Sequence, residues 1–98
     1  MKTMSLILSA ALALIFGLQA AQASCYADYK AKRDDPLRLH YGVIELPDAA
    51  CANKGTAKSE IAQRIGRDGW TLLSVVSLFD QSGLKEREKS ADTYYLRY

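Results

Sequence analysis

Residues 65–75 read Ile65-Gly66-Arg67-Asp68-Gly69-Trp70-Thr71-Leu72-Leu73-Ser74-Val75. This stretch joins the end of an amphipathic helix to the start of an apolar strand. Gly69 can adopt the left-handed conformation that ends many helices without a steric penalty. Trp70 then enters the junction of helix and sheet, where a ring that buries about 150–250 Å² is a large part of a small core. We therefore expect Gly69, Trp70, Leu73 and Val75 to belong to the structural core.

The segments on either side of this junction have the periods of a helix and of a strand. Ala57, Ile61 and Ile65 recur every four residues, which predicts a helix over residues 56–68 with a narrow apolar stripe. Residues 70–79 are apolar on both faces of an extended chain. Strands of that kind are usually central in a sheet and covered on both sides. We expect this strand to be central.

Two shorter strands precede the helix. Residues 34–36 read Asp-Asp-Pro, a sequence that is typical of a turn. Beyond them Leu37, Leu39 and Tyr41 alternate with polar residues, so their side chains should share one face. These signals predict a β-hairpin over residues 26–46. Gly42 interrupts the second strand and indicates a bulge or a sharp twist.

The C-terminal part of the chain is more polar. Residues 84–90 are charged and fit either a short exposed helix or an extended loop, and residues 93–98 alternate like a strand. The whole pattern predicts an α+β domain: a small antiparallel sheet with one packed helix, in the order ββαββ. A single helix covers only one face of a sheet. We expect the other face to contact a protein partner or a second copy of the chain. The tyrosines expected at its rim are Tyr94, Tyr95 and Tyr98.

The sequence from the helix into the strand resembles the core of a small bacterial domain family of unknown function. Its members typically read Leu-Gly-x-(Glu/Asp)-Gly-Trp-Glu-Leu-Val-x-Val after a short helix, and they end in a Tyr-rich strand. Asp68-Gly69-Trp70 match this motif and Tyr94-Tyr95-Leu96-Arg97 is similar to the last strand, whereas Thr71 replaces the usual acid. The resemblance covers roughly residues 61–98. It implies a fold and no activity, because the function of the family is itself unknown.

Residues 1–23 have the pattern of a secretory signal peptide. Met1-Lys2-Thr3 is a basic n-region, Met4 to Leu18 is almost entirely apolar, and Ala21-Gln22-Ala23 is a cleavage signature. The apolar run is shorter than the ~20 residues of a membrane-spanning helix, so we expect no retained span. The sequence thus predicts an exported protein, periplasmic or secreted, with one small domain at residues 24–98. A lipid anchor at Cys25 is the alternative, because Ala23-Ser24-Cys25 fits the last three places of a lipobox.

The two cysteines, Cys25 and Cys51, are expected to form a disulfide in an oxidising compartment. Such a bridge would close a loop of about 27 residues and contribute roughly 3–4 kcal/mol in the chain-entropy model. Acylation of Cys25 and a pair of free thiols are the two alternatives.

The chain holds few residues that suit catalysis. Its 13 basic and 11 acidic residues nearly balance, so no nucleic-acid partner is expected. His40 is the only histidine, and with two bridged cysteines it supplies no zinc site. We expect no catalytic residue, metal or cofactor, and interpret the protein as a non-catalytic binding or interaction module of the cell envelope. The alternatives are a small periplasmic enzyme or inhibitor with a site near His40, and a structural subunit of an envelope complex.

Overall fold

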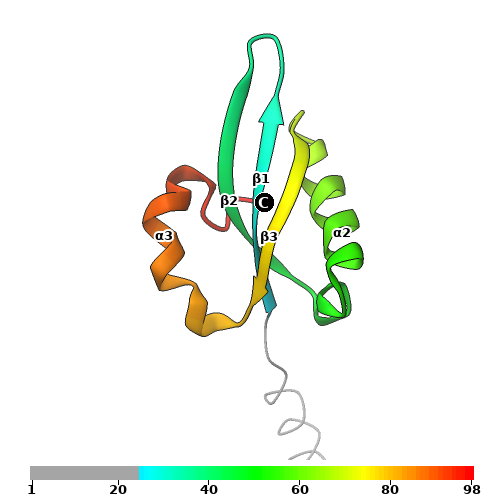
Figure 1. Cartoon of the computed structure of the whole chain (residues 1–98), viewed down its shortest axis with the longest axis vertical. Coiled ribbons are helices and arrows are strands. Elements are labelled where there is room, and N and C mark those ends of the chain that lie inside the picture. The colour runs from blue at the N-terminus through cyan, green and yellow to red at the C-terminus, as the bar shows by residue number, and fades with distance from the viewer. Residues whose placement is uncertain (1–24) are drawn as a thin grey trace, which may run out of the picture.

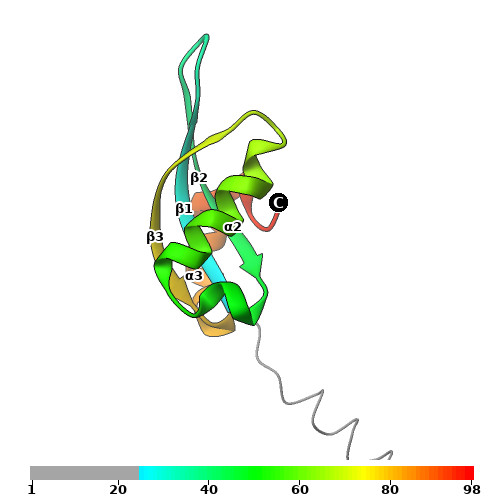
Figure 2. The same cartoon turned by 90° about the vertical axis from the view of Figure 1, so that its right-hand side faces the viewer.

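The computed structural model describes residues 25–98, and the predicted signal peptide, residues 1–23, lies outside the described residues. Three antiparallel strands form one sheet in the order β2-β1-β3. Helix α2 lies on one face of the sheet and the shorter helix α3 on the other (Figure 1 and Figure 2). The α+β class predicted from the sequence is confirmed. The elements are β1 (Cys25–Arg33), β2 (Arg38–Leu46), η1 (Asp48–Cys51), α2 (Lys54–Gly66), β3 (Thr71–Phe79), η2 (Gln81–Gly83), α3 (Lys85–Ala91) and η3 (Asp92–Tyr94).

The β1–β2 hairpin is regular along its whole length, and no register shift occurs at Gly42. Of the two features predicted at this glycine, a bulge or a sharp twist, the bulge is therefore absent. Gly42 lies opposite Tyr29, and a Cβ at Gly42 would come within 2.5 Å of the Tyr29 hydroxyl. The glycine leaves room for the ring of this fully buried tyrosine.

Local hydrogen bonds define both ends of α2. At the first turn, the Thr56 amide donates to the side chain of Asn53 at 2.8 Å, which caps the helix. At the other end Gly69 has a φ of 82°, and the Trp70 amide donates to the Ile65 carbonyl at 3.2 Å. These are features of a Schellman motif. As predicted, the left-handed glycine directs Trp70 into the core, where the indole is buried.

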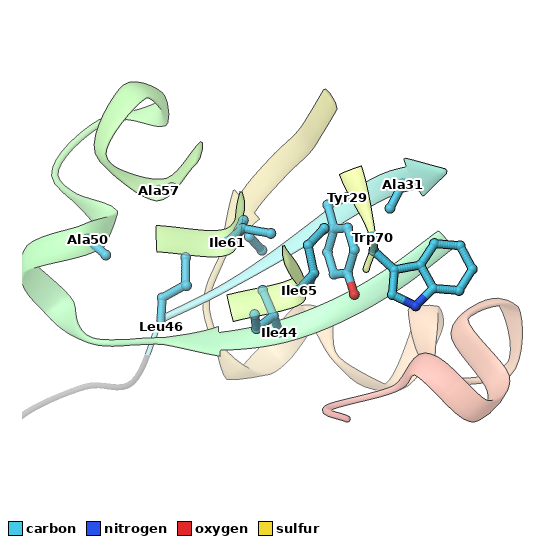
Figure 3. Close-up of a cluster of buried hydrophobic side chains, with 10 residues drawn as sticks. Tyr29, Ala31, Ile44, Leu46, Ala50, Ala57, Ile61, Ile65 and Trp70 are labelled. Atoms are coloured by element: carbon cyan, nitrogen blue, oxygen red, sulfur yellow. The ribbon is translucent and has the colours of Figure 1, made fainter. Parts of the chain in front are cut away.

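The hydrophobic core lies between α2 and the sheet (Figure 3). Ile61 and Ile65 of the helix are fully buried and belong to one cluster with Tyr29 and Ile44 of the hairpin. Val75 packs against this cluster, as predicted. Leu73, also predicted to be in the core, is instead 50% exposed. It lies at a shift in the pairing of β1 with β3 and has no residue of β1 opposite it.

The central strand is β1, and the prediction that residues 70–79 form a central strand is wrong, because β3 lies at one edge of the sheet. Only part of the apolar surface of β3 is buried. Leu72, Val75 and Leu78 pack against the core, whereas Val76 is 42% exposed. In contrast, β1 is buried on both faces over residues 26–29 although it contains an aspartate.

The prediction of a fourth strand over residues 93–98 is also wrong. This segment forms η3, followed by a single bridge between Tyr95 and Val43 of β2. Positive φ angles of 51° at Asp92 and 54° at Leu96 bend the chain. The charged stretch before it forms α3, so the second face of the sheet is partly covered by the chain itself.

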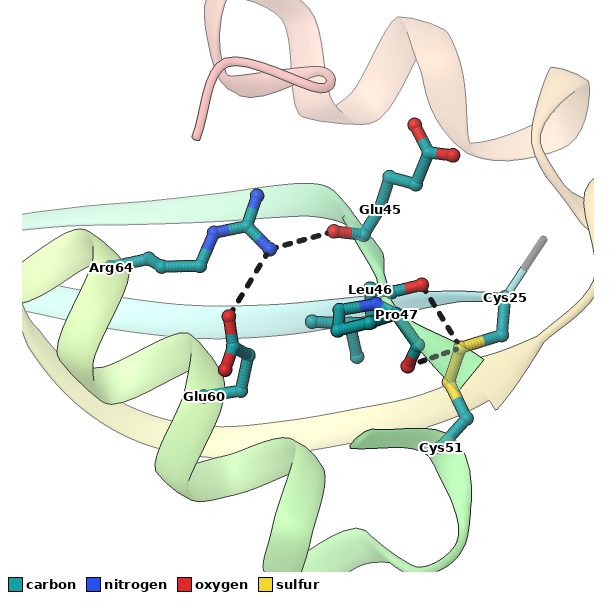
Figure 4. The surroundings of a disulfide bond; sticks show 7 residues. All are labelled: Cys25, Glu45, Leu46, Pro47, Cys51, Glu60 and Arg64. Carbon is teal, nitrogen blue, oxygen red and sulfur yellow. Dashed lines mark hydrogen bonds and ion pairs between the residues drawn. A yellow bond between two sulfur atoms is a disulfide. The ribbon is translucent and has the colours of Figure 1, made fainter. Parts of the chain in front are cut away.

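A disulfide joins Cys25 at the start of β1 to Cys51 in η1, with 6.5 Å between the Cα atoms (Figure 4). Nearby, the guanidinium of Arg64 in α2 donates to the Glu45 carbonyl at 2.8 Å and pairs with Glu60. These contacts fasten η1 and α2 to the sheet. The Sγ atom of Cys25, bonded to a second sulfur, is not free to carry a lipid.

Candidate functional site

A hydrogen-bond network around Asp28 covers part of the α3 face of the sheet. This carboxylate accepts hydrogen bonds from Ser77 at 2.6 Å, from Tyr41 at 2.7 Å and from Nε of Arg87 at 3.0 Å. The guanidinium of Arg87 also lies over the ring of Phe79, 4.0 Å from its centre. One arginine of α3 therefore holds the helix against the sheet by an ion pair and a cation–π contact together.

The network keeps Asp28 ionised. Burial alone raises the pKa of this carboxyl, but hydrogen bonds from Ser77, Tyr41 and Arg87, with the charge of Arg87, outweigh burial and lower the pKa below its usual value. The pKa of Tyr41 is raised to about 12 by burial and by its hydrogen bond to Asp28. Every partner of Asp28 donates a hydrogen bond, so the carboxylate acts as a structural acceptor.

Beyond this network, towards the turn of the hairpin, the same face is open. Along the ladder, Tyr41 lies opposite Lys30 and Leu39 opposite Lys32, on the side that also holds Asp28. A cavity of about 360 Å³ lies here, and we call it the hairpin groove. Leu39 is 67% exposed beside it. The groove is lined by Lys30, Ala31, Leu39, His40, Tyr41 and Leu73.

A second, smaller concavity lies on the α2 side of β3. It has a volume of about 260 Å³, and we call it the edge pocket. Leu73 lines both concavities, so they meet at the outer edge of β3. The amine of Lys54 is 3.5 Å from the Val76 carbonyl on this edge. The edge pocket is lined by Lys54, Gly55, Lys58, Leu73, Ser74 and Val75.

The ring of His40 packs within a buried aromatic cluster. Its Nε2 atom lies 3.0 Å from the Tyr29 hydroxyl, and its ring stacks on Tyr94 with 3.7 Å between ring centres. Trp70 meets the imidazole edge-on at 4.3 Å. The pKa of His40 is lowered to about 4, mainly by burial and to a smaller extent by the positive charges of Arg33 and Arg97. The ring is therefore neutral near pH 7. Among the described residues no carboxylate is hydrogen-bonded to His40, and the contacts are those of core packing.

The three tyrosines expected at a contact surface take part in contacts within the chain. Tyr94 stacks on His40, Tyr98 donates its hydroxyl to Asp68, and Tyr95 forms the bridge to β2. All three are half-buried. The exposed apolar side chains of the second face are instead those of the hairpin groove.

Residues 25–98 contain no group of three or more His, Cys, Asp or Glu side chains placed to hold a metal ion. Within the same range, no helix has both the length and the apolar character needed to cross a membrane.

Comparison of the chain with protein-family models, with curated proteins and with solved structures finds no match. The resemblance of residues 61–98 to a small bacterial family therefore stays a prediction.

Part of this site is visible in the sequence. The common face predicted for Leu37, Leu39 and Tyr41 is confirmed by the ladder for Leu39 and Tyr41, whereas Leu37 lies in the turn before β2. Lys54 and Lys58 have no such pattern, because lysines on the exposed side of a helix carry no signal of a nearby strand edge. The pairing of Asp28 with Arg87 has none either, since the two residues are 59 positions apart.

Proposed function

We propose that the protein is an exported, non-catalytic binding module that takes part of an envelope protein into the hairpin groove. The observation that carries this proposal is the exposure of Leu39 and Leu73, 67% and 50%, beside one concavity. Concave apolar sites with a few polar groups are where proteins most often bind their ligands. Here Lys30 and the half-buried Tyr41 supply the polar groups.

The aromatic cluster supports a binding module over an enzyme with a site near His40. A general base needs a ring nitrogen within reach of a substrate proton. The His40 ring is stacked on Tyr94, bonded to Tyr29 and 8% exposed. These contacts account for the histidine without a substrate.

The proposal is tested by placing a photoreactive amino acid at position 39 in the protein produced from its full sequence. After irradiation in cells, we expect one predominant adduct with an envelope protein, identified by mass spectrometry. The matched control carries the same amino acid at Gln63, which is exposed on α2 away from both concavities. Leu73→Ser should weaken the adduct at position 39. Equal adducts at positions 39 and 63, or none at 39, would contradict the proposal.

A further inference from the structure

The two outer edges of the sheet differ in what lies along them. At the edge of β2 the C-terminal segment adds a bridge through Tyr95, and the Leu96 amide donates to the Val43 carbonyl at 2.8 Å. At the other edge, β3 pairs with β1 only, and no further strand of residues 25–98 lies beside it. Apart from the Val76 carbonyl, which lies 3.5 Å from the Lys54 amine, the outward amide and carbonyl groups of β3 are therefore open to pairing with an added strand.

The composition of β3 does nothing to prevent such pairing. Natural edge strands usually carry charged residues or proline, which block the approach of another strand. Residues 71–79 contain no charged residue, no proline and no glycine. The two register shifts against β1 bend the strand and restrict regular pairing to a short segment. The edge is thus suited to a short extended peptide.

The residues around the edge of β3 indicate which kinds of side chain such a peptide should carry on each face. Successive side chains of an added strand would point alternately to the two faces of the sheet. On the α3 side they would meet the end of the hairpin groove that Leu73 lines, since Leu39 and Tyr41 lie on β2 at the opposite edge of the sheet. On the α2 side they would meet Lys54 and Lys58 in the edge pocket. No acidic residue of the described chain lines either concavity, so these amines favour carboxylates.

We infer that the outer edge of β3 binds an extended segment of a partner protein by strand addition, with apolar side chains on the α3 side and acidic ones on the α2 side. This inference rests on the proposed function and names the partner of the same site. Strand addition of this kind takes affinity from main-chain hydrogen bonds and specificity from alternate side chains. A second copy of β3 fits less well, because it brings no carboxylate to Lys54 and Lys58.

The probe is a fluorescent peptide of about eight residues, the length of a typical strand, in which Asp and Val alternate. It is titrated with the protein produced from its full sequence, and binding is followed by fluorescence anisotropy. We expect saturable binding. The same peptide with N-methyl groups on alternate amides keeps its side chains and loses the hydrogen bonds of one edge. The affinity of the N-methylated peptide should be lower by about tenfold or more. A peptide in which Lys replaces Asp should lose affinity to a similar degree.

Charge-reversal variants test whether the amines of Lys54 and Lys58 attract the acidic side chains of the peptide. Lys54→Glu combined with Lys58→Glu should weaken binding of the Asp-Val peptide about tenfold and strengthen binding of the Lys-Val peptide. Lys85→Glu is the control, because Lys85 is also exposed but lies at the start of α3, outside both concavities. This variant should bind the Asp-Val peptide as the unchanged protein does.

Four results would overturn the inference: no saturable binding, equal affinity for the N-methylated peptide, equal affinity for the Asp and Lys peptides, or a dimer in sedimentation that excludes the peptide. The last would assign the edge to a second copy of the chain. None of these results removes an adduct at position 39, so failure of strand addition is distinguishable from failure of the proposed binding function.

Discussion

The two faces of the sheet are closed by different chemistry, although β1 is buried on both. On the α2 face, Ile61 and Ile65 pack on the hairpin with Trp70 and Tyr29 in a continuous apolar core. On the α3 face, the ion pair of Asp28 with Arg87 holds a seven-residue helix over part of the sheet and leaves the hairpin groove open. A polar contact can fix a short helix at one place without covering the surface beyond it. The α2 face thus holds the larger apolar core, and the α3 face retains an accessible concave surface.

The largest expected effect tests the α2 face. Trp70→Ala should lower the free energy of unfolding by about 3–5 kcal/mol, because it removes a buried ring from the core. Chemical denaturation measures the loss. Leu73→Ala is the control, and should cost less than about 1 kcal/mol because Leu73 is half exposed. Similar losses for both variants would mean that the two faces do not differ as described.

The next test uses the pH dependence of stability. Because the pKa of His40 is lowered from 6.5 to about 4 in the folded protein, the unfolded chain binds a proton that the folded protein does not between those values. The free energy of unfolding should therefore fall as the pH falls from 6.5 towards 4, by on the order of 3 kcal/mol. Denaturation at a series of pH values measures this slope. In His40→Gln the slope should largely disappear, and an unchanged slope would assign the titration to another group.

A smaller loss is expected on the α3 face. Asp28→Asn keeps the shape of the side chain but removes the charge that pairs with Arg87, so stability should fall by about 2–3 kcal/mol. Glu86→Gln is a matched control, because Glu86 pairs with the same arginine but its side chain is 71% exposed. That variant should change stability by no more than about 0.5 kcal/mol. If both variants behaved alike, the Asp28 network would not be what holds α3 in place.

The smallest effect is predicted for the open half of the α3 face. Leu39→Ser should change the free energy of unfolding by less than about 0.5 kcal/mol, since the side chain is mostly exposed. Thermal and chemical denaturation of this variant check the prediction. A loss above about 1 kcal/mol would place Leu39 in the core and remove the groove as a separate surface.

Local sequence patterns predicted the elements that depend on neighbouring residues. The hairpin, the helix with its Ala57, Ile61 and Ile65 stripe, and the left-handed Gly69 all follow from the period of the chain or from one glycine. The alternation at residues 93–98 was misleading, because the tyrosines there pack on His40 and on the edge of β2 and do not extend the sheet.

The sequence by itself determined which segments are extended and which are helical, because those choices depend on residues a few positions apart. Only the tertiary structure decided the order of the strands and the part of the second face that remains open. Both depend on contacts between distant residues: Asp28 and Arg87 bring α3 onto the sheet, and the small side chains of Ala27 and Ala31 let β1 lie in the centre under α2. No local period encodes such contacts, so the hairpin groove and the free edge of β3 became visible only in the folded chain.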